Sequence, residues 1–347
     1  MRCWGDNYDG QLGDGSNADR WTPMAVGGLA NATALVAGHF HTCALLTDGT
    51  VRCWGDNWYG QLGDGTNTDR PMPVAVSGLT NVTALAAGGY HTCALLTDST
   101  VRCWGYNNWG QLGDGTSVDR RTPVAVSGLA NATALAGGSQ HSCALLTDAT
   151  VRCWGDNVNG QLGDGSSTWR LTPVAVSGLA NATALAAGFD HSCALLADGT
   201  LRCWGKNFSG QIGDGTTTGR LTPVAVVGPT DATALALGGD HSCALLTDGT
   251  MRCWGVNSYG QIGDGTTTQR HWATAVSGLA NVAALLAGTH HTCAQLNDGA
   301  VSCWGRNGDG QLGDGTTTQR TLPTPVIDTP FITIQIFGDG FEGGLLR

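Results

Sequence analysis

The chain has 347 residues, and its composition restricts both fold and function. Glycine accounts for 54 residues, whereas lysine and glutamate occur once each, as Lys206 and Glu342. Because lysine and glutamate are good formers of surface helices, we expect very little helix. The net charge of −10 argues against nucleic acid as a partner, since the phosphate backbone attracts basic surfaces. No run of 18 apolar residues occurs, so we expect no membrane span.

One motif recurs every 50 residues. The tripeptide Cys-Trp-Gly is followed each time by Asn-x-x-Gly-Gln-(Leu/Ile)-Gly-Asp-Gly-(Ser/Thr), as in residues 57–66. A fixed period of this length predicts a repeat architecture, in which single units cannot bury their apolar faces alone. The seven copies begin at Cys3, Cys53, Cys103, Cys153, Cys203, Cys253 and Cys303.

Each repeat contains four short segments with the character of strands. In the repeat at residues 31–76 they are 32–37, 41–46, 51–54 and 73–76, separated by Gly-rich turns. Seven such units predict an all-β fold, a seven-bladed β-propeller with four-stranded blades. An open solenoid is the alternative, but it needs polar caps that neither end resembles.

The two ends of the chain are predicted to meet in one blade. Aligning the last repeat with the first places residues 332–337 at the positions of residues 32–37. We therefore expect seven repeats in residues 1–326, and a C-terminal closing strand and tail in residues 327–347. Few residues follow that strand, so we expect the last blade to be incomplete. Met1 stands in the middle of a predicted strand, so we expect the chain to start inside a longer precursor.

Twelve of the thirteen cysteines lie in pairs ten residues apart. A type I turn followed by a left-handed Gly49 would place Cys43 opposite Cys53 in a hairpin. Opposed residues lie about 4.5–5.5 Å apart, within disulfide reach, so we predict disulfides rather than free thiols or metal ligands. Such disulfides indicate an extracytoplasmic location: secreted, periplasmic or at the cell surface. The predicted pairs are Cys43 with Cys53, Cys93 with Cys103, Cys143 with Cys153, Cys193 with Cys203, Cys243 with Cys253 and Cys293 with Cys303.

The repeat closely resembles the regulator of chromosome condensation repeat family. In one copy the matching residues are Gly88, His91, Ala94, Trp104, Gly105, Asn107, Gly110, Gln111 and Gly113. The resemblance covers roughly residues 1–326 and implies a seven-bladed propeller. The paired cysteines look like a bacterial, secreted branch rather than the nuclear members, which exchange nucleotide on a small GTPase. A bacterial member of similar size caps β-lactamases with one propeller face, which is the nearest precedent in size and compartment.

Two recurring polar residues are interpreted as structural. A histidine opens the second strand of six repeats, and adjacent blades would hold these rings too far apart to share one metal ion. We expect it to form a hydrogen bond to the neighbouring loop. The aspartate of each Gly-Asp-Gly lacks the ligand spacing of a calcium loop, so turn chemistry is favoured. No nucleophile elbow or phosphate loop occurs. We predict no enzymatic activity, no cofactor and no metal.

The repeats differ mainly in two loops, one before the recurring histidine and one after Trp-Gly-x-Asn. Strand direction places both loops on one face. It places the near-invariant hairpin turns between the paired cysteines, such as Asp48-Gly49, on the other face. Aromatic side chains grouped on one face are typical of protein recognition. Neutral drift at tolerant loop positions is the alternative explanation. The candidate binding residues are Tyr8, Phe40, Trp58, Tyr59, Tyr90, Trp109, Phe189, Phe208 and Tyr259.

We therefore predict a non-enzymatic, monomeric, secreted or surface propeller that binds a protein of unknown identity through this aromatic face. Two alternatives stay open. The near-identical repeats also suit a purely structural repeat module of a larger surface protein. A carbohydrate-binding lectin is the other alternative, because aromatic loops also stack on sugars.

Overall fold

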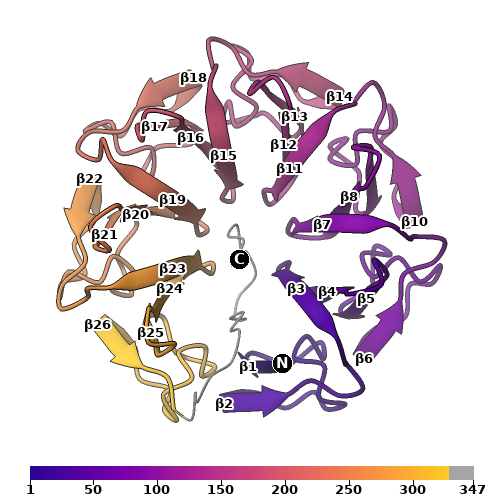
Figure 1. The fold of residues 1–347 in the computed structure, drawn as a ribbon, viewed down its shortest axis with the longest axis horizontal. Coiled ribbons are helices and arrows are strands. Elements are labelled where there is room, and N and C mark those ends of the chain that lie inside the picture. The colour runs from indigo at the N-terminus through magenta and orange to yellow at the C-terminus, as the bar shows by residue number, and fades with distance from the viewer. Residues whose placement is uncertain (328–347) are drawn as a thin grey trace.

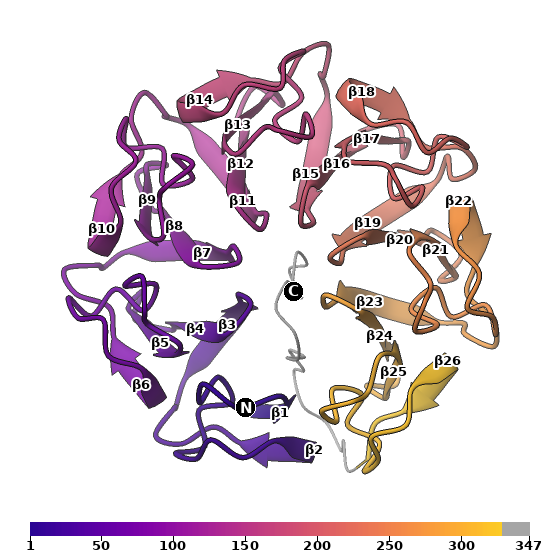
Figure 2. The same cartoon turned by 180° about the vertical axis from the view of Figure 1, so that it is seen from behind.

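The computed structural model describes residues 1–327. The regular secondary structure of these residues consists of β-strands alone, and the strands form blades around a ring (Figure 1). The first complete blade contains β3 (Ala32–Ala37), β4 (His41–Leu46), β5 (Val51–Gly55) and β6 (Arg70–Ala75), paired antiparallel in that order. Figures 1 and 2 place the first strand of each blade nearest the centre and the fourth at the rim. Residues 1–327 contain no helix that could cross a membrane.

Five further blades repeat this order. Their strands are β7 (Val82–Ala87), β8 (His91–Leu96), β9 (Val101–Gly105) and β10 (Arg120–Ala125); β11 (Ala132–Gly137), β12 (His141–Leu146), β13 (Val151–Gly155) and β14 (Arg170–Ala175); β15 (Ala182–Ala187), β16 (His191–Leu196), β17 (Leu201–Gly205) and β18 (Arg220–Ala225); β19 (Ala232–Leu237), β20 (His241–Leu246), β21 (Met251–Gly255) and β22 (Arg270–Ala275); β23 (Val282–Ala287), β24 (His291–Leu296), β25 (Val301–Gly305) and β26 (Arg320–Pro325).

The seventh position in the ring holds a two-stranded sheet of β1 (Arg2–Gly5) and β2 (Arg20–Ala25). The prediction of seven four-stranded blades is therefore wrong for the described residues, which form six such blades and this sheet. The physical reason is register: β1 and β2 correspond to the third and fourth strands of a repeat. The predicted closing strand at residues 332–337 lies outside the described residues.

The ring closes between the last four-stranded blade and this two-stranded sheet. Trp4 Nε1 donates a hydrogen bond to the main-chain oxygen of Gln311 at 3.1 Å. Gly315 N donates to the main-chain oxygen of Trp21 at 3.0 Å. The equivalent two bonds recur at each of the other six junctions. The closing junction therefore has the same chemistry as the others, and it joins residues 307 positions apart.

Apolar side chains fill the space between neighbouring blades. Leu45, Val51 and Leu62 of one blade pack with Leu85 and Trp104 of the next. The seven tryptophans of the Cys-Trp-Gly motif are at most 1% exposed and belong to these layers between blades. Burying one such large side chain contributes about 1.5–3 kcal/mol. The core is thus a set of layers around the ring, one at each junction.

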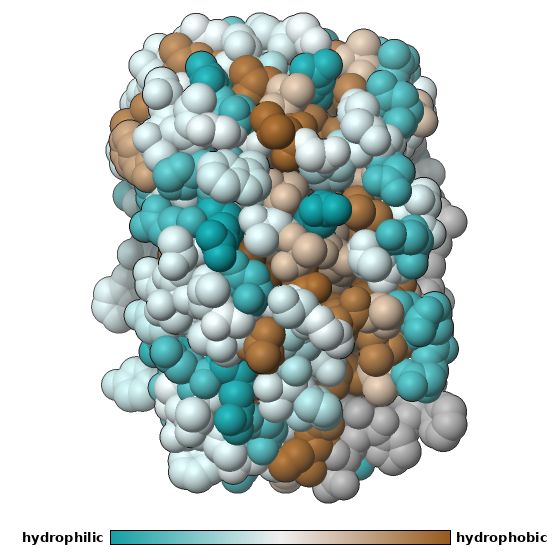
Figure 3. Space-filling view, turned by 90° about the vertical axis from the view of Figure 1, so that its left-hand side faces the viewer, coloured by the Kyte–Doolittle hydropathy of each residue, from teal (hydrophilic) through white to brown (hydrophobic). Residues whose placement is uncertain are grey.

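The outermost strands expose their edges at the rim. Six of the seven carry proline at their fourth position, as in Pro73 and Pro223, whereas β22 has Ala273. Proline lacks an N–H group, so it discourages pairing with a strand of another molecule. Exposed apolar residues such as Leu221 and Val227 also lie in this region. Figure 3, which views the side of the ring that carries β22, shows brown apolar side chains interspersed with white and teal ones.

All six predicted disulfides are present. Cys43 lies directly opposite Cys53 in the β4–β5 pair, with their Cα atoms 4.0 Å apart. The intervening turn is closed by a hydrogen bond from Gly49 N to Leu46 O, and Gly49 has φ +74°, as the predicted turn requires. The same pairing occurs in the five other four-stranded blades.

Removing one hairpin disulfide should destabilise the propeller. Replacing both Cys143 and Cys153 by alanine is expected to lower the free energy of unfolding by about 2–3 kcal/mol, because the short loop no longer restricts the unfolded chain. Urea denaturation under non-reducing conditions measures this change. The Cys3→Ala variant keeps all six disulfides and controls for the loss of a buried sulfur atom. Equal stability of the double variant and the unmodified protein would contradict the expectation.

Candidate binding face

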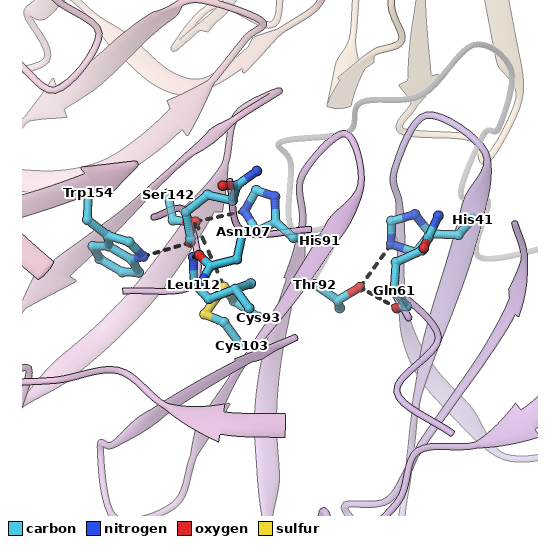
Figure 4. Close-up of a disulfide and its surroundings, with 11 residues drawn as sticks. His41, Gln61, His91, Thr92, Cys93, Cys103, Asn107, Leu112, Ser142 and Trp154 are labelled. Atoms are coloured by element: carbon cyan, nitrogen blue, oxygen red, sulfur yellow. Dashed lines mark hydrogen bonds between the residues drawn. A yellow bond between two sulfur atoms is a disulfide. The ribbon is translucent and has the colours of Figure 1, made fainter. Parts of the chain in front are cut away.

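At five junctions the recurring histidine connects one blade to the next through a chain of hydrogen bonds. Ser142 Oγ donates to the main-chain oxygen of Gln111 at 2.9 Å, and Trp154 Nε1 donates to the same oxygen at 2.8 Å. His91 Nε2 lies 2.8 Å from Ser142 Oγ (Figure 4). Because the single hydroxyl proton is directed at Gln111, the imidazole Nε2–H donates to the hydroxyl. The histidine forms a structural hydrogen bond as predicted, but the prediction of a neighbouring loop as its partner is wrong, because the acceptor is a strand hydroxyl of the next blade.

Burial keeps these imidazoles neutral. Desolvation lowers the pKa of His91 from 6.5 to about 3, with smaller contributions from His41, His141 and His39. The ring of His141 also explains the glycine three residues before it. A Cβ atom on Gly138 would lie 2.0 Å from His141 Cε1, closer than any side chain tolerates. The Gly-x-x-His motif is therefore a packing requirement of the buried ring.

The loops before these histidines are tied together around the centre of the ring. A main-chain hydrogen bond of 3.0 to 3.3 Å joins each loop to the next along a run of six blades. The residues that donate or accept in this run are His39, Gly89, Ser139, Phe189, Gly239 and Thr289. Their side chains differ from blade to blade while their backbone positions are held in common.

The second variable loop is held by its asparagine. Gly60 N donates to Asn57 O at 2.9 Å, which closes a β-turn whose two central residues are Trp58 and Tyr59. Asn57 Oδ1 accepts from Leu62 N, and its Nδ2 donates to main-chain oxygens further along the loop. Both variable loops lie on the same face, because Asp56 N donates to Phe40 O at 2.8 Å. We call this face, formed by loops 38–40 and 56–69 and their equivalents, the variable face.

The candidate binding residues differ in exposure according to their place in the turn. The first central residue of the turn projects into solvent: Tyr8 is 79%, Trp58 74% and Phe208 70% exposed. Tyr259, at the second place, is 36% exposed. The remaining five are half-buried, namely Phe40, Tyr59, Tyr90, Trp109 and Phe189. All nine are more accessible than the motif tryptophans.

Three of the candidate residues form one aromatic cluster with two that sequence reasoning did not select. Ring centroids lie 6.1 Å apart for Phe40 and Tyr90, 5.6 Å for Tyr59 and Tyr90, and 4.6 Å for Tyr59 and Tyr106. His39 stacks edge-on against Tyr90 at 5.2 Å. The cluster therefore spans the blades that contain β4 and β8.

Of the other candidates, only Phe189 makes a ring contact with this cluster within the described residues. Phe189 reaches His39 from another blade, with ring centroids 5.0 Å apart. Trp109 contacts Trp169 at 5.8 Å, and Tyr259 contacts His290 at 5.3 Å. No ring contact within the described residues joins Tyr8, Trp58 or Phe208 to this cluster.

Sequence reasoning missed Tyr106 and Trp169 because both stand at places treated as part of the motif. Tyr106 occupies the x of Trp-Gly-x-Asn, where other repeats have Asp56 or Lys206. Trp169 replaces an aspartate such as Asp119 before the fourth strand. Both places vary among the repeats, and that variation is the signal that could have found them.

An open groove crosses the variable face between two blades. It has a volume of about 720 Å³ and lies between the loop that carries Trp58 and Tyr59 and the loop that carries Asn108, Val118 and Asp119. Trp58 and Tyr59 provide an aromatic wall, while the asparagine and aspartate provide hydrogen-bonding groups. The groove can therefore accept a side chain that is apolar along its length and polar at its tip.

The Gly-Asp-Gly aspartates are engaged within their own loops. Asp64 accepts hydrogen bonds from Thr66 N and Oγ1 at 2.9 and 2.7 Å, and its other oxygen pairs with Arg70 at 3.0 Å. Burial opposes ionisation, but these hydrogen bonds more than offset it and lower the pKa of Asp64. The same Asp–Arg pair occurs in all seven repeats, which confirms the interpretation as turn chemistry.

Comparison with known proteins identifies the family. A family model described as the RCC1-like domain matches residues 1–243. The chain belongs to the RCC1-like domain family. Models of the regulator of chromosome condensation (RCC1) repeat also match residues 232–261, 282–311 and 298–336. The resemblance noted from the repeat motif is thereby confirmed.

Solved structures share the RCC1-like fold. Yeast RCC1 (Prp20), solved bound to Kap60, is 24% identical with a TM-score of 0.85, and the match covers 94% of this chain and 83% of that one. Human WBSCR16 is 22% identical with a TM-score of 0.84, covering 94% and 93%. The ectodomain of the receptor kinase CR4 from Physcomitrella patens is 22% identical with a TM-score of 0.55, covering 87% and 66%. A search among curated protein sequences gave no significant match.

Stability should fall as the pH is lowered from about 6.5 toward about 4. Burial lowers the pKa of five recurring histidines to about 3 and that of His191 to about 4, so they stay neutral in the folded protein. Unfolded histidines titrate near 6.5, so unfolding takes up protons throughout this window and becomes easier. Asp9, whose pKa is raised to about 6 by burial and then by nearby carboxylates, opposes this trend, as do Asp56, Asp119 and Asp190, whose pKa values burial also raises.

The free energy of unfolding, measured by urea denaturation between pH 7 and pH 4, tests this expectation. The His141→Gln variant should show a slope smaller by about one proton, even if it is less stable at every pH. A free energy of unfolding that does not change across the window would contradict the neutral, buried state of the histidines.

Proposed function

We propose that this chain is a non-enzymatic binding propeller of an extracytoplasmic compartment, and that it holds a protein partner on the variable face. The proposal rests mainly on one observation: within a single loop, constant residues hold the backbone while the residues at the centre of the turn vary. Asn57 and Gln61 hold the backbone of the turn, and its two central residues, Trp58 and Tyr59 in this repeat, are free to differ among repeats. A rigid frame with variable, exposed aromatic residues suits recognition, because stiff aromatic anchors lose little entropy on binding.

The disulfides support the extracytoplasmic part of the proposal. Six disulfides at this density are typical of chains that fold in an oxidising environment such as the periplasm, the cell surface or the medium. A bacterial, secreted member of the family remains the origin that this arrangement suits best.

The engagement of the recurring polar groups supports a non-enzymatic role. Residues that could perform acid–base chemistry, such as His91 and Asp64, are committed to hydrogen bonds between or within blades. The imidazole of His91 is fully buried, so a substrate on either face could not reach it.

A protein that shares this fold has been observed in a complex with another protein. Yeast RCC1, which shares the fold, was solved in complex with Kap60. At 24% identity this precedent supports the use of the fold for protein binding and not a particular partner.

A carbohydrate ligand is a second candidate, which the groove beside Trp58 favours. Its lining includes Asn67, Asn108 and Asp119 next to an exposed indole, a combination that could stack on a sugar ring and bind its hydroxyl groups.

Photo-crosslinking distinguishes these possibilities. A benzophenone side chain at position 58 should yield a discrete protein adduct from the secreted or cell-surface fraction of the producing cell, and one at Asp98 on the opposite face should not. With the partner isolated, Trp58→Ala should weaken its binding by about 2 kcal/mol, and Asp98→Ala should leave binding unchanged. An adduct from position 98 alone would contradict the proposal, and oligosaccharide binding that depends on Trp58 would favour the second candidate.

A further inference from the structure

The groove beside Trp58 has acidic surroundings as well as aromatic walls. Asp119 lines it directly, and Asp56 lies at the base of the turn, where it accepts a hydrogen bond from Trp58 N at 2.9 Å. Arg121 also lines the groove, and its side-chain stem faces Gly60. This single arginine is outnumbered by the carboxylates of the two adjoining loops.

More carboxylates lie next to this groove, on the side of the two-stranded sheet. Asp9 occupies the second central place of its turn, equivalent to Tyr59. Burial raises the pKa of Asp9, and repulsion from Asp56, Asp69 and Asp6 adds to this effect, so that together they bring it to about 6. The backbone holds two of these carboxylates beside each other, because Asn57 N donates to Asp69 Oδ1 at 2.8 Å and the next N–H, of Trp58, donates to Asp56. A cation placed among them would relieve this repulsion.

Apart from Arg121 and the arginines paired with the Gly-Asp-Gly aspartates, the basic residues of the variable face lie in other blades and are engaged. Lys206 bridges Asp190 and Asp240, with its Nζ 3.6 Å and 3.2 Å from their carboxylate oxygens. Arg306 pairs with Asp309 at 3.0 Å. No ion pair among residues 1–327 includes Asp9, Asp56, Asp69 or Asp119. The face is thus divided into two halves. In the half around Lys206 and Arg306 the charges are paired. In the other, which we call the acidic half, Asp9, Asp56, Asp69 and Asp119 form no ion pair with the described residues.

Exposed aromatic rings lie in the same acidic half. Trp58 stands in solvent beside the groove, and Tyr8 stands at the equivalent place one repeat earlier. Indole and phenol faces attract guanidinium and ammonium groups by about 0.5–2 kcal/mol each. Carboxylates and aromatic faces together select for cationic side chains that also have an aliphatic stem.

We infer that the partner docks on this half of the variable face through a segment rich in arginine or lysine, one side chain of which enters the groove beside Trp58. The inference rests on the proposed function, and it specifies the chemistry of the partner. Charge complementarity would also speed association at low ionic strength.

A labelled peptide of alternating arginine and serine tests the inference by fluorescence anisotropy at low salt. Saturable binding to the unmodified protein should weaken about fivefold in Trp58→Ala and in the double variant Asp9→Asn/Asp69→Asn. Phe208→Ala removes an equally exposed ring from the other half, and Asp98→Asn/Asp148→Asn removes the same charge from the opposite face. Both controls should bind within about twofold of the unmodified protein.

Three results would overturn the inference: no saturable binding of the arginine peptide, equal weakening in the control variants, or tighter binding of the matching glutamate–serine peptide. Failure of the inference can be told apart from failure of the proposed function. A protein adduct at position 58 whose formation is unaffected by Asp9→Asn/Asp69→Asn refutes the basic segment and leaves protein binding intact. Absence of any adduct at position 58 refutes protein binding itself.

Discussion

The main-chain carbonyl group of the motif glutamine is the point on which the ring depends. At each junction it accepts the indole N–H of the next blade, and a strand hydroxyl joins it at six of them. These groups are buried, and an indole N–H left without an acceptor would cost about 1–3 kcal/mol. This indole hydrogen bond recurs at seven junctions. A displaced blade would therefore leave several buried polar groups without a hydrogen-bond partner at once. Apolar packing supplies most of the stabilisation, and these hydrogen bonds determine how the blades are aligned.

This division of roles explains why most of each repeat is constant. Histidine, glycine, asparagine, glutamine and aspartate each have a structural partner within the blade or across the junction. The fold does not require a particular side chain at the remaining places. These are the central residues of the turn after Asn57, the loop before the histidine and a few positions beside them. Variation gathered at these places changes the surface chemistry without affecting the junctions. The variable face can therefore carry an acidic, aromatic half and a half with paired charges on one uniform frame.

Much of this arrangement was predictable from the sequence, because it depends on spacing. The ten-residue separation of Cys43 and Cys53 defined the hairpin, and strand direction placed Phe40 and Tyr59 on the same face. The repeat count alone gave too many four-stranded blades, because the described residues of the first repeat form only its third and fourth strands, β1 and β2. The different exposure of Trp58 and Tyr59 follows from turn geometry, which hydrophobic patterns do not encode. The contact between His39 and Phe189 joins two blades that are not neighbours in the sequence, so no local sequence pattern indicates it.

Hydrogen exchange of the tryptophan indole N–H groups, followed by NMR, tests the closed ring most directly. The chain has 12 tryptophans, and the seven in the motif are buried with their N–H groups bonded across junctions. We expect all seven to exchange slowly and at similar rates, while exposed Trp58 and Trp272 exchange quickly in the same sample. Rapid exchange at Trp4, with protection kept at the other six, would mean that the ring is open at that junction and would contradict the account.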